Sequence, residues 1–419
     1  MRKVYVTGLG FATCLGLDAP SIVERLQTLR HGIVRHPAFD TPDVALKVAA
    51  PVPGFNVDGD DAEDWTFPDC LRFRLEQYRC LSPNVLYSCY SMVKAIEDAG
   101  LTEEEVSNPD TGIFTASAGS MQMIYANMHR LKTLGPKRCS PMAIVASIAG
   151  TLNFNLVARH KIQGSSTGMV SACASSGHAM GYAYDEIALG RQERMFVVGA
   201  EDFTADTVVP FGVMRVLSPQ GNPDIASRPF DRDRDGFVAT GGSVVMVLES
   251  EAAVKKRNAN VYAEFKGWGQ STDGYHVAIS HPEGAGLRRA MEKAMQSAGV
   301  SVDDVDYINA HATSTPIGDA AECQALKTVF GNALKAPVVS STKALTGHAL
   351  SLSSVMEASF SALAIRHGFM PGAAHLEHVD PVAQGLNLPR ETLDEKPGIV
   401  LSNSSGFGGA NVAVVLGAP

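Results

Sequence analysis

The sequence has no apolar run approaching the 18 residues that a membrane-spanning helix requires. It also shows no basic-then-apolar secretory leader, because Met1 leads directly into VYVTGLG, a short strand pattern closed by a turn. Both absences argue against secretion and against membrane insertion. We therefore expect a soluble, cytoplasmic protein.

The cysteines form no pattern that would bind zinc or build a disulfide framework. There are seven of them, an odd number, and no two are spaced as Cys-x-x-Cys. Such scattered thiols suit a reducing compartment. They are Cys14, Cys70, Cys80, Cys89, Cys139, Cys173 and Cys323.

The sequence also has fewer basic residues than acidic residues. The chain has 35 Lys and Arg residues against 44 Asp and Glu residues, a formal net charge of −9. This balance argues against non-specific nucleic-acid binding, which needs a basic face. The hydrophobic fraction of 45% is that of an ordinary globular protein, and 419 residues predict two domains or one large two-part fold.

Short β-branched runs alternate with longer helical patterns, which predicts an α/β fold with a largely buried sheet. The expected strands are 4–9, 111–117, 167–172, 195–200, 243–249, 260–269, 305–312, 337–342, 398–403 and 412–417. The expected long helices are 86–100, 286–299 and 355–368.

The two halves of the chain share one arrangement. A predicted helix ends in Ala-Gly at residues 98–100 and again at 297–299, and each is followed by a strand that ends in Gly, Ser, Thr or His. We interpret this as an internal duplication with a seam near residues 250–260. The predicted division is into residues 1–255 and 256–419.

Cys173 lies in the stretch VSACASSGHAMG, between a predicted strand and a predicted helix. The helix N-terminus favours a thiolate over a thiol, and small neighbours permit a tight turn and close approach of a substrate. A buried, inert cysteine is the competing interpretation. His178 lies five residues on and projects away from Cys173 around the helix, so we expect it to be structural.

Two further segments place histidines at strand ends. In NAHATSTPIGDAAE, His311 closes an apolar strand and is followed by hydroxyl residues, including Thr313 and Thr315, that could bond a polar substrate arm. In SSTKALTGHALSLSS, Lys343 follows a strand and His348 opens a helix, where the helix dipole favours neutral imidazole. A structural role for His311 and an exposed surface charge at Lys343 remain open on these patterns alone.

The segment SNSSGFGGANVAVVL predicts two strands joined by a Gly-rich hairpin. Its glycines could let backbone N–H groups point into a cavity, as an oxyanion hole requires, although a plain hairpin explains them equally. Taken together, one Cys, two His and one Lys at separate strand ends form a coherent set. A thiolate would hold an acyl group while two imidazoles stabilise negative charge on the carbonyl oxygen of a second substrate.

These segments resemble the β-ketoacyl-acyl-carrier-protein synthases, the type I/II condensing enzymes or ketosynthases. The matching motifs occur in family order from residue 4 to residue 416. They are VSACASSGHAMG, RPFDRDRDGFV, NAHATSTPIGDAAE, STKALTGH and SNSSGFGGAN. The resemblance implies a thiolase-type αβαβα fold, duplicated within the chain and normally homodimeric.

The resemblance also implies roles for the catalytic set. Cys173 matches the acyl-accepting nucleophile, and His311 and His348 match the pair that bind the malonyl thioester and stabilise its enolate. Lys343 matches the lysine that supports the second histidine, and Glu322 matches the buried acidic partner near that lysine.

Further residues match supporting positions of the family. The N–H groups of Cys173 and Phe407 would form the oxyanion hole, with Phe407 as a mobile gate over the acyl pocket. Phe237 matches the ring against which the malonyl carboxylate is held, which favours loss of CO₂ by desolvation. Thr313 and Thr315 match residues that hydrogen-bond the phosphopantetheine arm.

The implied reaction is a decarboxylative Claisen condensation that extends an acyl chain by two carbons, with substrates delivered on acyl carrier protein. No metal or redox cofactor is needed, because an activated thioester and loss of CO₂ drive it. Since carrier proteins are acidic, a basic docking surface is expected. The candidates are Arg130, Lys132, Lys137 and Arg138, followed by Arg72 and Arg74.

Three positions depart from the family pattern. Ala312 replaces the usual Gly, Ser405 replaces an aromatic residue, and residues 351–354 read Ser-Leu-Ser-Ser in place of Gly-Ala-Ala-Gly. They leave open a specialised pathway, such as polyketide or aryl polyene assembly, and pairing with a related chain as a heterodimer. A non-catalytic chain-length partner, a thiolase and a coenzyme-A-primed synthase are disfavoured, because the four catalytic positions are all kept.

Overall fold

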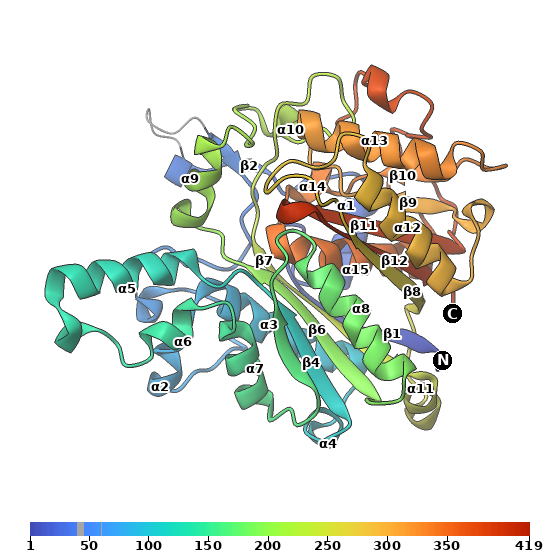
Figure 1. The fold of residues 1–419 in the computed structure, drawn as a ribbon. Coiled ribbons are helices and arrows are strands. Elements are labelled where there is room, and N and C mark those ends of the chain that lie inside the picture. The colour runs from blue at the N-terminus through green and yellow to red at the C-terminus, as the bar shows by residue number, and fades with distance from the viewer. Residues whose placement is uncertain (40–45, 60) are drawn as a thin grey trace.

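The computed structural model describes residues 1–39, 46–59 and 61–419, and its main feature is a ten-stranded sheet built from two similar halves (Figure 1). All ten predicted strands are present. The first half contains β1 (Val4–Ala12), β4 (Thr111–Ala116), β5 (Ser166–Met169), β6 (Arg194–Glu201) and β7 (Gly242–Ser250). The second half contains β8 (Ala263–Thr272), β9 (Tyr307–Asn309), β10 (Val338–Ser340), β11 (Ile399–Gly406) and β12 (Ala410–Gly417).

The two halves have the same topology. The sheet order is β10-β9-β11-β12-β8-β1-β7-β6-β4-β5, so each half places its own strands in the order third, second, fourth, fifth, first. In each half the first strand is antiparallel to the fifth, the fifth to the fourth, and the remaining pairs are parallel. Antiparallel pairing of β1 with β8 joins the halves, with Val4 opposite Phe265 and Val6 opposite Ala263. The predicted duplication is therefore confirmed.

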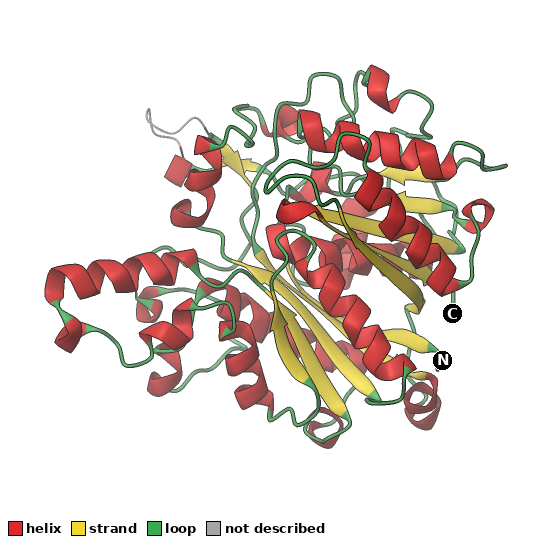
Figure 2. Ribbon diagram, in the orientation of Figure 1, coloured by secondary structure: helices red, strands yellow, loops and turns green. Residues whose placement is uncertain are grey.

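Helices form three layers around these strands (Figure 2). The outer helix α3 (Pro83–Ala99) contacts β1 and β7, and α7 (Thr151–His160) contacts β4 and β5. In the second half, α12 (Ala285–Ala298) covers β8 and β12, and α13 (Pro316–Phe330) packs beside it. Between the halves lie α8 (Ser175–Ala188) and α15 (Ser353–His367), which contact each other and strands of both halves. The five layers are those of the thiolase-type fold.

The remaining elements connect these layers. Two short strands, β2 (Val34–Arg35) and β3 (Val48–Ala49), pair separately. The other helices are α1 (Ala19–Gln27), α2 (Leu75–Tyr78), α4 (Glu103–Val106), α5 (Met121–Leu134), α6 (Ala143–Ser147), α9 (Ala205–Val213), α10 (Pro223–Ala226), α11 (Glu251–Arg257) and α14 (Lys343–Thr346). The predicted division at residue 255 falls within α11, and α5 extends far to the left in Figure 1.

The strand β7 shows why the sequence forms buried strands. Its alternate residues Val244, Met246 and Leu248 face one hydrophobic cluster, and Val245 and Val247 face another. All five are fully buried. A strand that is covered by helices on both faces has a continuous apolar sequence, and β7 shows this pattern. In the described ranges, no helix is both long and apolar enough to cross a membrane.

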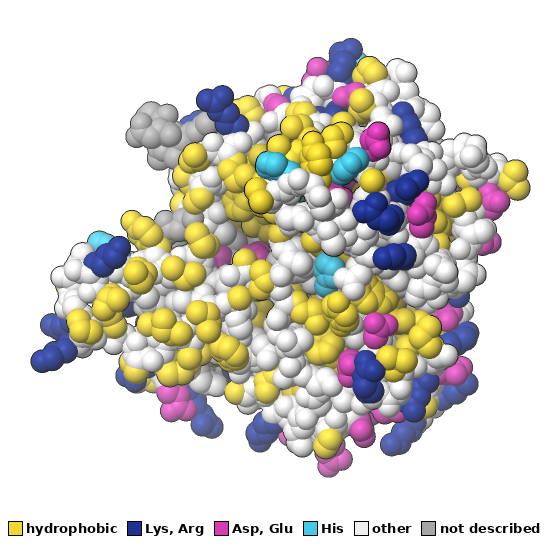
Figure 3. Space-filling view, viewed as in Figure 1, with side chains coloured by type: hydrophobic (Ala, Val, Ile, Leu, Met, Phe, Trp, Pro, Cys, Tyr) yellow, Lys and Arg dark blue, Asp and Glu magenta, His cyan; other side chains and the backbone are white. Residues whose placement is uncertain are grey.

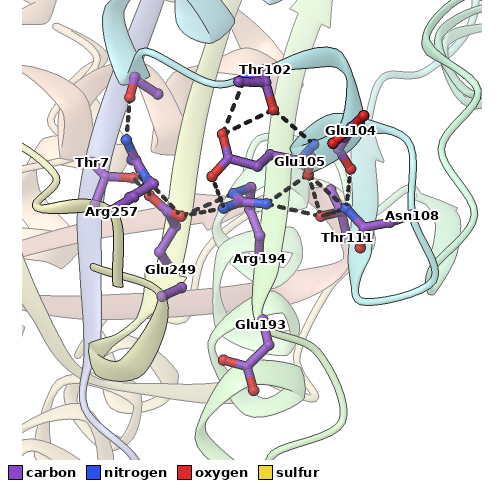
Figure 4. A network of polar contacts seen from close by, with 12 residues as sticks. Thr7, Thr102, Glu104, Glu105, Asn108, Thr111, Glu193, Arg194, Glu249 and Arg257 are labelled. Carbon is purple, nitrogen blue, oxygen red and sulfur yellow. Dashed lines mark hydrogen bonds and ion pairs between the residues drawn. The ribbon is translucent and has the colours of Figure 1, made fainter. Parts of the chain in front are cut away.

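A buried ionic network ties the first half together at one end of the sheet (Figure 4). The Glu249 carboxylate on β7 accepts hydrogen bonds from Thr7 at 2.6 Å and from Arg194 Nη2 on β6 at 2.7 Å. Arg257, at the end of α11, also donates to it. Burial acts to raise the pKa of Glu249, but these donors hold that pKa below its ordinary value. The network therefore links β1, β6, β7 and α11.

Replacing Glu249 by Gln should destabilise the protein by about 3 kcal/mol, because the side chains of Arg194 and Arg257 then lose their shared counter-charge. The measurement is the free energy of unfolding in urea. Glu251→Gln is the matched control, since that residue forms an exposed pair with Lys255 and its loss should leave the free energy of unfolding nearly unchanged. Equal effects of the two substitutions would contradict a structural role for the network.

Candidate active site

Cys173 lies in a tight turn between β5 and α8. Ala172, the residue before it, has φ +50°, a left-handed conformation that residues with a side chain seldom adopt. The Ser175 hydroxyl stabilises the turn by accepting from the backbone N–H of Ser171 at 2.8 Å and donating to the Ala172 carbonyl at 2.6 Å. The predicted strand-to-helix elbow at Cys173 is therefore present.

His348 comes from the second half of the chain and reaches this turn. Its backbone N–H donates to the Val238 carbonyl at 2.7 Å, and its carbonyl accepts from the Thr240 N–H at 3.3 Å. These bonds fix the residue beside the segment that leads into β7. The side chain is buried, and its Nε2 lies 3.0 Å from Cys173 Sγ.

His311 completes the cluster. Its backbone N–H donates to Glu322 Oε1 at 2.8 Å, and its ring lies almost perpendicular to that of His348 with centroids 5.2 Å apart. Ligand-type atoms of Cys173, His311 and His348 all lie within 4.8 Å of one another. The thiol and the two imidazoles thus face one small volume.

Both imidazoles are neutral near pH 7. Burial lowers the pKa of His348 well below 6.5, and the Lys343 ammonium lowers it further. The pKa of His311 is also lowered well below 6.5, mainly by burial and then by the charges of Lys343 and His348. The sequence predicted a neutral His348 from a helix dipole, but α15 begins five residues later, so burial and Lys343 are the causes.

The partly buried Cys173 thiol is not favoured as a thiolate in the free protein, contrary to the expectation from the helix N-terminus. Burial raises the pKa of the thiol to about 12 and outweighs the lowering by Lys343. Glu201 and Glu357 oppose the thiolate as well. The resting group is therefore a thiol, and its proton must leave as the nucleophile reacts.

Lys343 is fully buried, so the alternative of an exposed surface charge is excluded. Its ion-pair partner is Glu357 on α15, with Nζ 2.5 Å from Oε1. Glu322 is also buried, and it lies close enough for the charge of Lys343 to act on its carboxyl, but it does not form the ion pair. Its Oε1 accepts from the His311 backbone and from Asn403 Nδ2 at 2.6 Å. The sequence held a signal for this pairing, because Glu357 is the only charged residue between 353 and 365 in a helix that is otherwise apolar or small.

The predicted aromatic residues occupy different positions around the cluster. Phe237 is buried, with its ring centroid 5.3 Å from that of His348 and perpendicular to it. Phe407 lies at the tip of the β11–β12 hairpin and is 42% exposed. A Cβ on Gly406 would lie 3.0 Å from the Cys173 backbone nitrogen, so glycine is required for the hairpin to approach the elbow this closely.

The loop that follows His311 is held by a buried arginine. Arg234, in the RPFDRDRDGFV segment, forms ion pairs with Asp319 and Asp380 and donates to the Pro316 carbonyl at 2.9 Å. Within this loop the hydroxyl oxygens of Thr313 and Thr315 lie 3.0 Å apart. The arginine thus positions both predicted pantetheine-contacting residues.

Other predicted residues lie away from the cluster. His178 bonds Ser171 Oγ at 2.8 Å and the Ala174 carbonyl at 3.1 Å through Nδ1, and packs on Tyr182 and Trp268, a structural role as predicted. The first four candidates for the docking surface, Arg130, Lys132, Lys137 and Arg138, lie on α5 and just beyond it, far from the β11–β12 hairpin within one protomer (Figure 1). Lys132, Lys137 and Arg138 are exposed, Arg130 pairs with Asp61 at 2.8 Å, and Arg72 and Arg74 are exposed.

Among the residues that the structure describes, two clusters have donor atoms close enough to bind a metal ion. One is the thiol and imidazole set of Cys173, His311 and His348, whose soft donors suit zinc. The other is Asp231, Asp233 and His378. In the second cluster Asp231 Oδ2 already accepts from the His378 backbone N–H at 2.8 Å.

Comparisons with known proteins agree with this architecture. Residues 1–253 match the family model described as the beta-ketoacyl synthase N-terminal domain, and residues 262–377 match the C-terminal domain. The chain is 35% identical over 425 residues to 3-oxoacyl-[acyl-carrier-protein] synthase 1 of Haemophilus influenzae, covering 99% of this chain and 98% of the relative. It is 34% identical to 3-oxoacyl-[acyl-carrier-protein] synthase 2 of Coxiella burnetii, covering 99% and 98%.

Solved structures show the same fold. A beta-ketoacyl synthase from Burkholderia phymatum superposes with a TM-score of 0.90 at 29% identity and covers all of both chains. The ishigamide ketosynthase/chain length factor superposes with a TM-score of 0.88 at 27% identity, covering 100% of this chain and 99% of that one. Fold and site therefore define a thiolase-type condensing enzyme, of the acyltransferase class. More narrowly, the chain belongs to the beta-ketoacyl synthase family.

The influence of Lys343 on the thiol is testable by replacing the ion pair as a unit, Lys343→Met with Glu357→Gln, which leaves no unpaired buried carboxylate. Because Lys343 lowers the pKa of Cys173, its loss should raise that pKa and slow alkylation of Cys173 by iodoacetamide at pH 8 about fivefold. Peptide mass spectrometry measures the rate at this cysteine alone. Glu251→Gln with Lys255→Met, an exposed pair, is the control, and an unchanged or faster rate in the buried-pair variant would refute the effect.

Proposed function

We propose that the protein is a 3-oxoacyl-[acyl-carrier-protein] synthase that extends an acyl chain on Cys173 by two carbons from malonyl carrier protein. The observation that carries this proposal is the convergence of one thiol and two neutral imidazoles within 4.8 Å. A thiol alone suits any acyl transfer. Two uncharged N–H donors beside it additionally suit a thioester carbonyl that must become an enolate.

In the first stage Cys173 Sγ attacks the thioester carbonyl carbon of the acyl carrier protein. The bond to the pantetheine sulfur breaks, and that sulfur leaves as a thiol with the proton that Cys173 gives up. Backbone N–H groups of Cys173 and Phe407 stabilise the tetrahedral oxyanion. Support for this role is the close approach of Gly406 to the Cys173 nitrogen.

In the second stage His311 and His348 donate hydrogen bonds to the carbonyl oxygen of the malonyl thioester. The carboxylate lies against Phe237, whose apolar ring disfavours the charged group and so favours loss of CO₂. The electron pair of the broken C–C bond passes into the enolate, which attacks the acyl thioester on Cys173. The new C–C bond forms as the C–S bond breaks, and Sγ leaves as a thiolate that takes one proton from solvent. This chemistry needs no metal or redox cofactor.

The carrier protein delivers both substrates on a phosphopantetheine arm, which Thr313 and Thr315 would bond. A basic dock for the acidic carrier is formed by Arg130, Lys132 and the adjacent Lys137 and Arg138. These residues lie at the far end of α5, so a second protomer must bring them to the entrance of a site. The docking proposal thus depends on dimerisation.

A second chain is proposed to pair along β5. This strand is the edge of the sheet, its residues Ser166–Gly168 are exposed, and an exposed edge is a template for pairing. Exposed apolar side chains lie beside it in α6, α7 and the turn after β5, and Figure 3 shows yellow side chains gathered over this region. They are Ile144, Ile148, Phe154 and Val170.

A specialised polyketide or aryl polyene pathway is the second candidate function, and in it the partner would be a related, non-catalytic chain. The 27% identity to the ishigamide ketosynthase/chain length factor favours it, as does the unusual serine-rich start of α15. The two candidate functions differ in the length of the acyl chain that is made and in the type of primer that is accepted. Assays over saturated, unsaturated and aryl primers would show which pathway the protein serves.

Condensation itself is tested with acyl and malonyl thioesters of carrier protein, following CO₂ release and the 3-oxoacyl product by intact mass. The wild type should form product with or without EDTA, and Cys173→Ala should form none above background, because the acyl acceptor is gone. Formation of 3-oxoacyl product by Cys173→Ala would contradict the mechanism. If the wild type alone were inert and became active on mixing with a related chain, the heterodimer would be favoured.

Dimerisation is tested by placing charge on the proposed interface. Phe154→Glu with Val170→Glu should convert a dimer into a monomer, since two like charges then face their symmetry mates across an apolar contact. Light scattering after size exclusion measures the mass. Leu334→Glu, at an exposed leucine in the loop after α13, is the matched control and should remain dimeric.

A further inference from the structure

Three hydroxyl groups, one in the turn just before α15 and two in its first residues, each contact a different group in or near the active site. Ser351 donates to the buried Glu201 carboxylate, and Ser354 donates to the Cys173 carbonyl at 3.2 Å. Ser353 lies between them and contacts the His348 ring, with its Oγ 3.0 Å from Nδ1. Only Ser353 therefore touches a ring nitrogen of the cluster.

The proton of the Ser353 hydroxyl has one available acceptor. The side chain is fully buried, and its Oγ already accepts from the Ala349 backbone N–H at 3.2 Å. Within the described ranges, the only acceptor that this hydroxyl contacts is His348 Nδ1. A buried hydroxyl that donates to nothing loses the energy of a hydrogen bond, so the donated proton points at Nδ1.

The opposite tautomer, in which the proton is on Nδ1 of His348, is less favourable. If Nδ1 carried the proton, the Ser353 oxygen would receive two N–H groups, from Ala349 and from His348, while its own proton would point at no acceptor. His348 Nε2 would then present a lone pair, instead of a donor, to the space it shares with Cys173 and His311. An acceptor there cannot stabilise a developing oxyanion.

We propose that Ser353 is a positioning residue that holds neutral His348 as the Nε2–H tautomer. The proton on Nε2 then faces Cys173 Sγ at 3.0 Å and the volume where a thioester oxygen would bind. The catalytic consequence rests on the proposed function, but the tautomer itself is a property of the free protein. Ser353, which is one of the residues that differ from the family pattern, thus orients the imidazole of His348.

The direct test is ¹⁵N NMR of the intact protein labelled at its histidines, with His348 assigned by its loss in His348→Asn. The wild type should show a protonated Nε2 and an unprotonated Nδ1 at His348. Ser353→Ala should shift this residue toward a mixture of tautomers, and Ser353→Thr should restore the wild-type pattern. Ser361→Ala is the matched control, because that buried hydroxyl on the same helix donates to the Glu357 backbone carbonyl at 2.8 Å and is not part of the cluster.

Kinetics give an independent readout. Release of CO₂ from malonyl carrier protein should fall about fivefold in kcat in Ser353→Ala with KM little changed, the effect of losing one buried hydrogen bond that matters in the transition state. Ser353→Thr should recover the rate. A wild-type His348 protonated on Nδ1, or a tautomer unchanged in Ser353→Ala, would overturn the proposal. Absence of CO₂ release from the wild type would instead refute the proposed function and leave the NMR result standing.

Discussion

The contact between His348 Nε2 and Cys173 Sγ is the constraint on which the rest of the site depends. It joins residues 175 positions apart and belonging to opposite halves of a duplicated fold. The elbow at Ala172 presents the thiol, while backbone bonds to Val238 and Thr240 fix the imidazole. The two central helices α8 and α15 hold these parts at a fixed separation, so the site exists only when both halves are packed together.

Burial gives this contact its chemical character. It keeps both imidazoles neutral and the thiol protonated, and it places Lys343 and Glu357 as a fully buried pair behind them. Burial, with a smaller contribution from the nearby Glu322, raises the pKa of Glu357 to about 7, against the pull of Lys343. The ammonium therefore acts on the cluster through a low-dielectric interior, where its influence on the thiol is larger than it would be in water.

The strands were predictable because central strands of a layered α/β protein are covered on both faces. Segments such as 195–200 and 243–249 consequently carry continuous apolar runs. His311 closes such a run, and Cys173 and Lys343 follow predicted strands, so these residues could be identified as strand-end groups at the edge of a sheet. His348 follows the short helix α14, and the sequence pointed to it through the segment STKALTGH. Family resemblance then supplied their roles.

Other features depend on packing between distant segments, which local patterns do not encode. The partner of Lys343 is Glu357 and not Glu322, because α15 brings its one carboxylate under the lysine. The high pKa of Cys173 follows from closure of the site by both halves, whereas the local sequence shows only a helix N-terminus. The contact of Ser353 with His348 spans only five residues, but it requires the 3₁₀ turn between them. In the first two cases the neighbour is distant in the sequence, and no spacing reveals it.

The most direct test of the account is to trap the acyl-enzyme. The protein is incubated with acyl carrier protein thioester alone, without malonyl donor, and the acylated residue is located by peptide mass spectrometry. The account predicts one acyl group per active chain, on Cys173. Acylation of another residue, such as the exposed Cys70, with Cys173 left free, would contradict it.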